Sequence, residues 1–349
     1  MKIPRRRAVV LGVLGLTLGA ALVVHFNKPR PLTKPAFQTA KPVKPTQDSA
    51  PDLDPLQIQA LQVRIYSAST LSVTQNLGDQ GGYTQTISSF ISDGLTEYAL
   101  VSTPGGTKPS GGWPVVILAH GYINPVTYQT AGADYATLTA ELARAGYMVV
   151  KPDYRGHGKS QGQPDGGHLS PVYAYDVLNL IATLKNAPTI NHSRIGLIGH
   201  SLGGHVALRT IVVSRDVKAT VFISGVVGSM EDLFYNWPNS PMPSDQPATL
   251  VQGIKSALIS KYGDPHQNPV FWNSASAINY VSTVTGAVQI NHSIGDTTVP
   301  ITFSQHLNAA LQSQHKSVDF YTYPGDDHQF SQNHAVLIQR IIAFYAAHL

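Results

Sequence analysis

The chain has 349 residues, of which 42% are hydrophobic and none is cysteine; this is enough for one large domain, and it excludes disulfides, thiolate metal sites and a cysteine nucleophile. The net charge of +4 is unevenly placed, because residues 1–47 hold nine Lys or Arg and no acid, whereas the rest has 15 basic against 20 acidic residues. Phosphate contacts need clustered basic side chains, so we expect no nucleic-acid partner for this acidic body.

The chain opens on a basic and then an apolar stretch. Residues 1–7 carry four Lys or Arg, and residues 8–24 are apolar or small with one exception. This pattern predicts that residues 1–26 are an uncleaved signal anchor or a cleaved signal peptide. We favour the anchor because residues 22–24 continue the apolar run past a possible small-residue cleavage site at 19–21. The rest of the chain is then expected outside the cytoplasm and tethered to the membrane, the alternative being a secreted or periplasmic protein.

A linker and the beginning of a sheet follow. Residues 27–55 are rich in Pro and Lys and lack apolar periodicity, which is typical of an extended linker. We assign residues 56–349 to a single folded domain. Its first part has alternating and β-branched residues around Gly or Asn turns, which predicts antiparallel strands at 62–66, 86–92 and 95–101.

Apolar strands then alternate with helical patterns, which predicts a mostly parallel sheet with helices on both faces. The expected strands are residues 115–119, 147–151, 195–198, 221–223, 288–290 and 319–323. The expected helices are residues 134–145, 170–185, 202 to about 213, and 332–347.

A longer Pro-rich stretch with several aromatic side chains interrupts this alternation at about residues 226–285. An insertion at this point predicts a lid or a substrate wall above the strand ends. The alternative is that its aromatic residues only pack the insertion onto the core.

The pentapeptide Gly199-His200-Ser201-Leu202-Gly203 joins the strand at 195–198 to the next helix. It has the G-x-S-x-G pattern of a nucleophile elbow, in which a strand turns sharply into a helix and the serine hydroxyl projects above the sheet. We expect a strained backbone at the serine, and collisions if either glycine carried a side chain. Ser201 is the predicted nucleophile.

A serine hydroxyl needs a base to accept its proton, and the base needs an acid to fix its tautomer. In this type of fold the chain order is Ser, then Asp or Glu, then His. Asp296 follows the strand at 288–290, and His328 follows the strand at 319–323. Because parallel strands gather their chemistry at their carboxyl ends, we predict that Ser201, Asp296 and His328 form a catalytic triad.

Two other aspartates compete for the role of the acid. Asp326 and Asp327 directly precede His328, but they follow a different strand from Asp296 and lie too near in sequence to orient the imidazole ring easily. An Asp-Asp-His metal site is a further alternative for these three residues, and it lacks other ligands at a suggestive spacing. We therefore expect no metal ion and no cofactor.

Acyl transfer also needs two backbone donors for the oxyanion of its transition state. One is the N–H of Leu202, the residue after the nucleophile. The other is expected from the loop after the strand at 115–119, where we assign it to the N–H of Tyr122, with Gly121 allowing close approach. His120 is interpreted as a structural hydrogen-bonding residue.

Five ordered motifs together resemble the α/β-hydrolase superfamily across residues 85–349. They are His120-Gly121-Tyr122, residues 152–160, residues 199–204, residues 296–300 and His328. Within this superfamily, residues 276–281 ahead of 296–300 resemble the catalytic domain of prolyl-oligopeptidase-like serine peptidases. Leu202 departs from the aromatic residue that usually follows the nucleophile there, and the sequence has no repeat array that could form their gating propeller.

The resemblance implies an α/β-hydrolase fold with a lid-like insertion, and a serine hydrolase that cleaves a peptide, amide or ester bond through an acyl-enzyme. We favour a prolyl-oligopeptidase-like serine peptidase acting on a short peptide or a small ester, with a carboxylesterase or lipase-type ester hydrolase as the alternative. A non-catalytic binding protein of this fold is a more distant alternative, because such proteins typically lose a triad residue. Membrane contact is expected only through the N-terminal segment.

Overall fold

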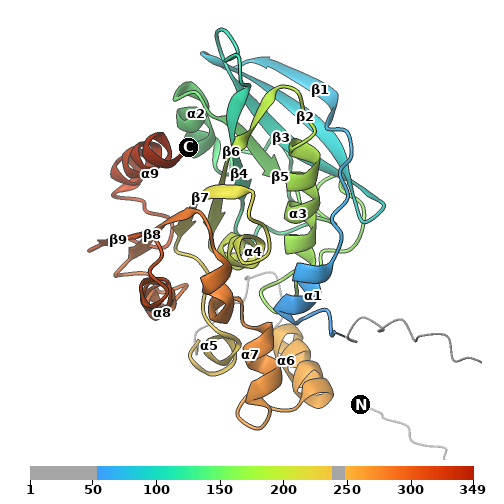
Figure 1. The fold of residues 1–349 in the computed structure, drawn as a ribbon, viewed down its shortest axis with the longest axis vertical. Helices are drawn as coiled ribbons and strands as arrows, with labels where there is room; N and C mark the ends of the chain where they lie inside the picture. Colours follow the sequence, from blue (N-terminus) through green and yellow to red (C-terminus); the bar gives the residue numbers. More distant parts are fainter. Residues whose placement is uncertain (1–52, 238–247) are drawn as a thin grey trace, which may run out of the picture. The chain divides into compact units, whose positions relative to one another are not determined.

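The computed structural model describes residues 53–237 and 248–349 (Figure 1). The predicted anchor or signal peptide at 1–26 lies outside the described residues, as does nearly all of the predicted linker at 27–55. In the part of the chain that is described, no helix has the length and apolar character needed to cross a membrane.

Nine strands form one sheet in the order β1-β2-β3-β5-β4-β6-β7-β8-β9. Neighbouring strands in the sheet pair antiparallel from β1 through β2 and β3 to β5. From β5 across to β9, every neighbouring pair is parallel. The mostly parallel sheet is therefore confirmed. The strands are β1 (Ser72–Asp79), β2 (Tyr83–Ser92), β3 (Leu95–Pro104), β4 (Trp113–Ala119), β5 (Met148–Pro152), β6 (Ile190–His200), β7 (Val217–Ile223), β8 (Ala287–Ser293) and β9 (Val318–Tyr323).

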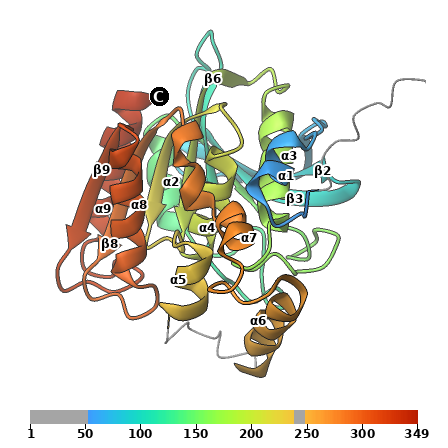
Figure 2. The same ribbon diagram turned by 60° about the horizontal axis from the view of Figure 1, so that its bottom comes forward.

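Helices cover both faces of the sheet (Figures 1 and 2). One face packs against α2 and α9, and the other against α3, α4 and α8, with α1 and α7 in the same hydrophobic cluster. The helices are α1 (Ile58–Val63), α2 (Ala136–Arg144), α3 (Val172–Leu184), α4 (Leu202–Ile211), α5 (Met230–Tyr235), α6 (Ala248–Tyr262), α7 (Pro269–Ala275), the 3₁₀ helix η1 (Ala277–Thr283), α8 (Ile301–Ser313) and α9 (His334–His348).

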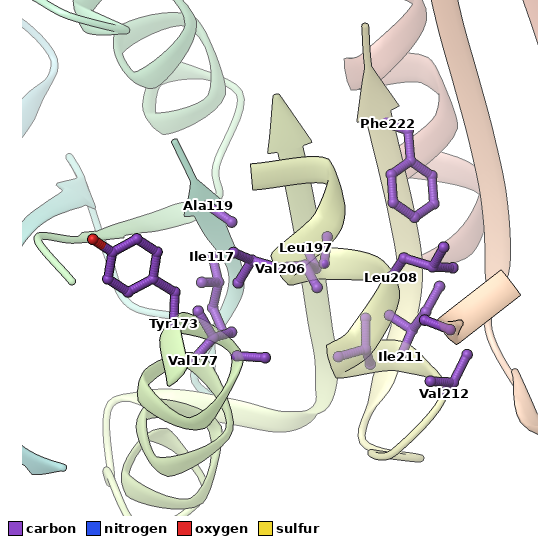
Figure 3. Packing of buried hydrophobic residues seen from close by; sticks show 14 of the residues in the cluster. Ile117, Ala119, Tyr173, Val177, Leu197, Val206, Leu208, Ile211, Val212 and Phe222 are labelled. Carbon is purple, nitrogen blue, oxygen red and sulfur yellow. The ribbon is translucent and has the colours of Figure 1, made fainter. Parts of the chain in front are cut away.

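The central strand β4 is apolar and buried along its whole length, because both of its faces are covered. In β4, Ile117 and Ala119 point toward α3 and α4, whereas Val116 and Leu118 point toward α2 and α9. Figure 3 shows Ile117 and Ala119 beside Val206 of α4. Successive side chains of a strand alternate between faces, so an uninterrupted hydrophobic run places half of its side chains in each layer of the core.

The order of the strands also positions the site. The chain places β5 on one side of β4 and β6 on the other, so the direction of winding reverses between β4 and β6. Open α/β sheets bind their ligands in the crevice beyond the carboxyl ends of the strands at such a reversal. The loop that begins at His120 leaves β4 there, and the turn at Ser201 leaves β6 beside it.

The strand predicted at 62–66 is wrong. Residues up to Val63 belong to α1, which buries Ile58 and Leu61, one turn apart. Val63 and Ile65 are 68% and 86% exposed, so the apparent alternation does not mark a strand with one buried face. The strand that does begin the sheet, β1, was not predicted, because it is an edge strand with almost no buried side chain.

The described part of the insertion contains α5, α6, α7 and η1. Its aromatic side chains pack on one another and on the core: the Phe234 and Trp272 rings lie 4.9 Å apart, and Tyr262 stacks on Phe271 at 4.2 Å. Trp237 is buried and donates its indole N–H to the carbonyl of Thr298 at 2.9 Å. This is the packing role of the alternative interpretation, and a lid stays a prediction.

Candidate active site

Ser201 lies at the sharp turn between β6 and α4. Its backbone has φ 53° and ψ −121°, a region that a residue with a side chain enters only under strain. A Cβ at Gly203 would overlap the carbonyl of Ala119 in β4, and one at Gly199 would lie 2.5 Å from the carbonyl oxygen of Gly203. Both glycines are therefore required by the close crossing of strand and helix, as predicted from the pentapeptide.

The structure brings the three predicted triad residues together from the ends of three strands. His328, on the loop after β9, has its Nε2 2.9 Å from the Oγ of Ser201. Its Nδ1 lies 2.8 Å from Oδ2 of Asp296, on the loop after β8. With Nδ1 donating to the carboxylate, Nε2 is free to accept the serine O–H, which is the arrangement of a base poised against a nucleophile.

The carboxylate of Asp296 is fully buried and rich in hydrogen-bond donors. Oδ1 accepts from the backbone N–H of Thr298 and of Val299, at 2.8 and 2.9 Å. Burial by itself would raise the pKa of Asp296, but the hydrogen bonds from His292, His328 and Val299 outweigh it and hold the pKa well below its usual range. Asp296 is thus an ionised acceptor facing His328.

His292 is a contributor that sequence reasoning missed. Its Nε2 lies 3.3 Å from Oδ2 of Asp296 and 3.0 Å from the carbonyl oxygen of Val299, and its Nδ1 lies 2.7 Å from the Oγ of Ser304. A carbonyl only accepts, so Nε2 carries the proton and Nδ1 accepts from the hydroxyl. The one available signal was a histidine at the carboxyl end of a strand, four residues before the acid.

The competing acids have other partners. Asp326 accepts hydrogen bonds from the backbone N–H groups of Gln332 and Asn333, at 3.1 and 2.9 Å. Asp327 accepts from Ser331 and from the backbone N–H of Gln329. Both carboxylates therefore brace the turn between β9 and α9.

The predicted oxyanion donors flank the nucleophile. Leu202 is the first residue of α4, so its N–H has no acceptor within the helix. Tyr122 follows Gly121, where a Cβ would lie only 3.0 Å from Cβ of Ser201. Gly121, Tyr122, Ser201 and His328 line a cavity of about 450 Å³. The close approach expected at Gly121 is present.

His120 is fully buried, and its Nδ1 lies 2.7 Å from the carbonyl oxygen of Gly121. Its ring packs against Tyr154 at 4.3 Å. Burial holds the pKa of His120 well below the usual range. These contacts are those of the structural role that the sequence suggested.

Two further side chains that sequence reasoning did not single out contact this cluster. The hydroxyl of Tyr135, the residue before α2, lies 2.7 Å from the backbone nitrogen of Gly121 and 2.7 Å from Nδ1 of His200. Nε2 of His200 lies 3.3 Å from the carbonyl oxygen of His328. No local pattern in the sequence marks Tyr135 or His200 as a member of this cluster.

Among residues 53–237 and 248–349, no group of three or more His, Asp or Glu is arranged to hold a metal ion. The Asp-Asp-His alternative at 326–328 thus gains no further ligand among these residues.

Known proteins resemble the chain in sequence and in fold. Residues 114–261 match the family described as serine aminopeptidase, S33. An uncharacterized peptidase, YtmA, of Bacillus subtilis (strain 168) is 24% identical over 190 residues, which are 54% of this chain and 68% of that protein.

Two solved structures illustrate the likeness of fold. Dipeptidyl peptidase 4 of Porphyromonas gingivalis matches 77% of this chain with a TM-score of 0.59 and 20% identity. The acetyl xylan esterase of Paenibacillus sp. R4 matches 84% with a TM-score of 0.62 and 19% identity. The match spans 36% of the peptidase but 92% of the esterase.

Proposed function

Because the chain is a serine peptidase or esterase of the α/β-hydrolase superfamily, we propose that it cleaves a peptide or ester bond through an acyl-enzyme formed on Ser201. The observation that carries the proposal is the position of His328, which lies within hydrogen-bond distance of both the Ser201 hydroxyl and the Asp296 carboxylate. A nucleophile, a base and an acid that orients the base are the side chains that acyl transfer to water requires.

In the first step, Oγ of Ser201 attacks the substrate carbonyl and its proton passes to Nε2 of His328. The ionised Asp296 stabilises the imidazolium that forms and keeps the ring in the required tautomer. His328 then gives the proton to the leaving amine or alcohol as the scissile bond breaks. Water attacks the resulting acyl-enzyme by the same route, and the free acid leaves with Ser201 restored.

Each attack places a negative charge on the former carbonyl oxygen. The N–H groups of Leu202 and Tyr122 are the proposed donors to that oxyanion. They lie on backbone held by the elbow and by the loop after β4, so their dipoles are oriented before the reaction begins. Such preorganised donors stabilise the oxyanion without having to reorient during the reaction.

A peptide substrate is the favoured proposal. It is supported by the serine aminopeptidase description of the matching family and by the peptidase in Bacillus subtilis. An ester substrate is the second candidate, and it is favoured by extent: the match spans 92% of an acetyl xylan esterase but about a third of a dipeptidyl peptidase. The activity of the whole protein is a proposal in either case.

A fluorophosphonate probe tests the nucleophile directly, because it phosphonylates only an activated serine. The wild type should be labelled at Ser201, and Ser201→Ala should not be labelled although it folds. Peptide mapping of the labelled protein identifies the residue. An unlabelled wild type would support the non-catalytic binding protein instead.

The same wild-type and Ser201→Ala proteins distinguish the two substrate classes. Simple p-nitrophenyl esters have a better leaving group than p-nitroanilides. A peptidase should hydrolyse aminoacyl or prolyl p-nitroanilides with a higher kcat/KM than this difference in leaving group predicts. Turnover of the esters alone, with no detectable cleavage of any anilide, would assign the ester function.

A further inference from the structure

A chain of hydrogen bonds runs behind the nucleophile and joins three separate parts of the fold. It begins at the backbone N–H of Gly121 after β4, passes through the Tyr135 hydroxyl to Nδ1 of His200 at the end of β6, and ends at the carbonyl of His328 after β9. The successive distances are 2.7, 2.7 and 3.3 Å. These groups come from loops 65 and 128 residues distant in sequence from His200.

The chemistry of the groups fixes the direction of this chain. The carbonyl of His328 can only accept, so Nε2 of His200 must carry a proton. In a neutral imidazole Nδ1 is then an acceptor, and the Tyr135 O–H donates to it. The oxygen of Tyr135 still has a lone pair for the N–H of Gly121. Every donor and acceptor in the chain is satisfied in a single arrangement.

His200 stays neutral in this position. Its side chain is 5% exposed, and burial, together with the neighbouring His328, lowers the pKa of His200 to about 3. The two imidazole rings lie 5.1 Å apart. A charged His200 would oppose the imidazolium that the proposed mechanism forms on His328, whereas the neutral ring does not.

The groups are also tightly packed. A Cβ at Gly121 would lie 3.0 Å from the Tyr135 hydroxyl and 3.3 Å from Nδ1 of His200. Tyr135 itself has φ 64°, an uncommon backbone conformation for a residue with a side chain, which must be held in place by its contacts. The hydroxyl of Tyr135 is the contact that ties it to both neighbours.

We propose that Tyr135 and His200 are positioning residues that hold the loop carrying Tyr122 and the loop carrying His328 at their working distances from Ser201. The inference rests on the proposed function, since it concerns the same site. Gly121 precedes the proposed oxyanion donor Tyr122, and the carbonyl of His328 belongs to the proposed base. The chain of hydrogen bonds through Tyr135 and His200, which we call the relay, therefore sets the geometry of the oxyanion hole and of the base together.

Tyr135→Phe tests the relay by removing one oxygen atom. It leaves the Gly121 N–H and Nδ1 of His200 without their partner, so the loop carrying Tyr122 loses its link to the elbow. The hydrogen bond from His200 to the carbonyl of His328 remains possible, but no donor then fixes the tautomer of His200 that makes it. We expect kcat for p-nitrophenyl acetate to fall at least about tenfold with KM little changed, because the loss affects the transition state. Direct removal of an oxyanion donor lowers kcat by a factor of about 10² to 10³, and this is the upper limit for an indirect effect.

Tyr345→Phe is the matched control. Tyr345 is buried and donates its hydroxyl to the carbonyl of Leu197 in β6 at 2.9 Å, so this variant also removes a buried tyrosine hydroxyl that is bonded to β6, with the loss of one hydrogen bond rather than two. It should lose stability but keep the wild-type kcat. Equal kcat values for Tyr135→Phe and Tyr345→Phe, with Ser201 still labelled by the fluorophosphonate, would overturn the relay and leave the proposed function standing.

Two substitutions at His200 carry the test if Tyr135→Phe does not fold. His200→Gln keeps an N–H that can reach the carbonyl of His328, whereas His200→Leu keeps no polar group. We expect kcat to decrease from wild type to His200→Gln and again to His200→Leu. Identical kcat values for the two variants would contradict the proposal.

Discussion

Asp296 is the residue on which the tautomer of the proposed base depends. Its carboxylate accepts two backbone N–H groups on Oδ1 and faces His328 and His292 with Oδ2. An amide in its place would present either a donor to Nδ1 of His328 or a weaker, neutral acceptor. The ring would then be free to adopt the tautomer whose Nε2 carries the proton and cannot accept one from Ser201.

We therefore expect Asp296→Asn to lower kcat by about 10⁴, the loss that the same change causes in a serine protease triad. Circular dichroism and a thermal melt should show that the variant is folded. Asp326→Asn is the comparison, because Asp326 braces the turn before α9 through Asn333 and Gln332. It should destabilise the fold while the folded protein keeps most of its kcat. If Asp326→Asn lowered kcat far more than Asp296→Asn, the acid of the triad would be Asp326.

At the scale of elements, the site depends on how closely α4 crosses β4 and β6. The contact is made backbone to backbone at Gly203, where a Cβ would overlap the carbonyl of Ala119. Gly203→Ala must push helix and strand apart, and we expect it to lower the free energy of unfolding by about 3 kcal/mol. It should also reduce fluorophosphonate labelling, because the elbow that carries Ser201 moves with the helix.

Gly253→Ala is the control for this change. Gly253 lies in α6, and nothing lies within 4 Å of the place its Cβ would occupy. Alanine is a better helix former than glycine, so the free energy of unfolding of this variant should rise by up to about 1 kcal/mol. Chemical denaturation of both variants measures the contrast. A Gly203→Ala protein as stable as Gly253→Ala would show that the crossing has room to relax.

At the scale of the whole molecule, a buried carboxyl makes stability depend on pH. Glu97 in β3 is 0% exposed. Burial, and then the nearby Asp176, raise the pKa of Glu97 well above its ordinary value. The folded protein therefore keeps the Glu97 proton over a range of pH in which the unfolded chain has released it. Because the folded state binds the extra proton, the free energy of unfolding falls as pH rises through this window.

Glu97→Gln should remove this dependence, since an amide has no proton to release. The variant should have the higher urea midpoint at pH 9, and its advantage over the wild type should shrink at pH 5. Glu141→Gln, at an exposed position beside Arg144, should shift the midpoint little and equally at both pH values. A difference between Glu97→Gln and wild type that does not change with pH would mean that Glu97 is ionised in the fold.

Much of this molecule could be predicted from its sequence because the signals are local. The strand β4, which is buried on both faces, is an unbroken apolar run. The turn from β6 into α4 requires Gly199 and Gly203 beside Ser201. Parallel strands all end at one edge of the sheet, so the position of Asp296 and His328 after successive strands predicted that they would meet. Local signals also misled at 62–66, where alternation of apolar residues occurs on an exposed segment.

The tertiary structure decided what no local pattern encodes. Tyr135 and His200 share a hydrogen bond across 65 residues, and His292 turns its ring onto Asp296 only because the loop after β8 folds back over the strand. The edge strand β1 has no buried face and so has no apolar period. Hydrophobic periodicity and turn residues reflect interactions between neighbours in the sequence. The hydrogen-bond partners around the nucleophile depend instead on which strand ends the sheet brings side by side.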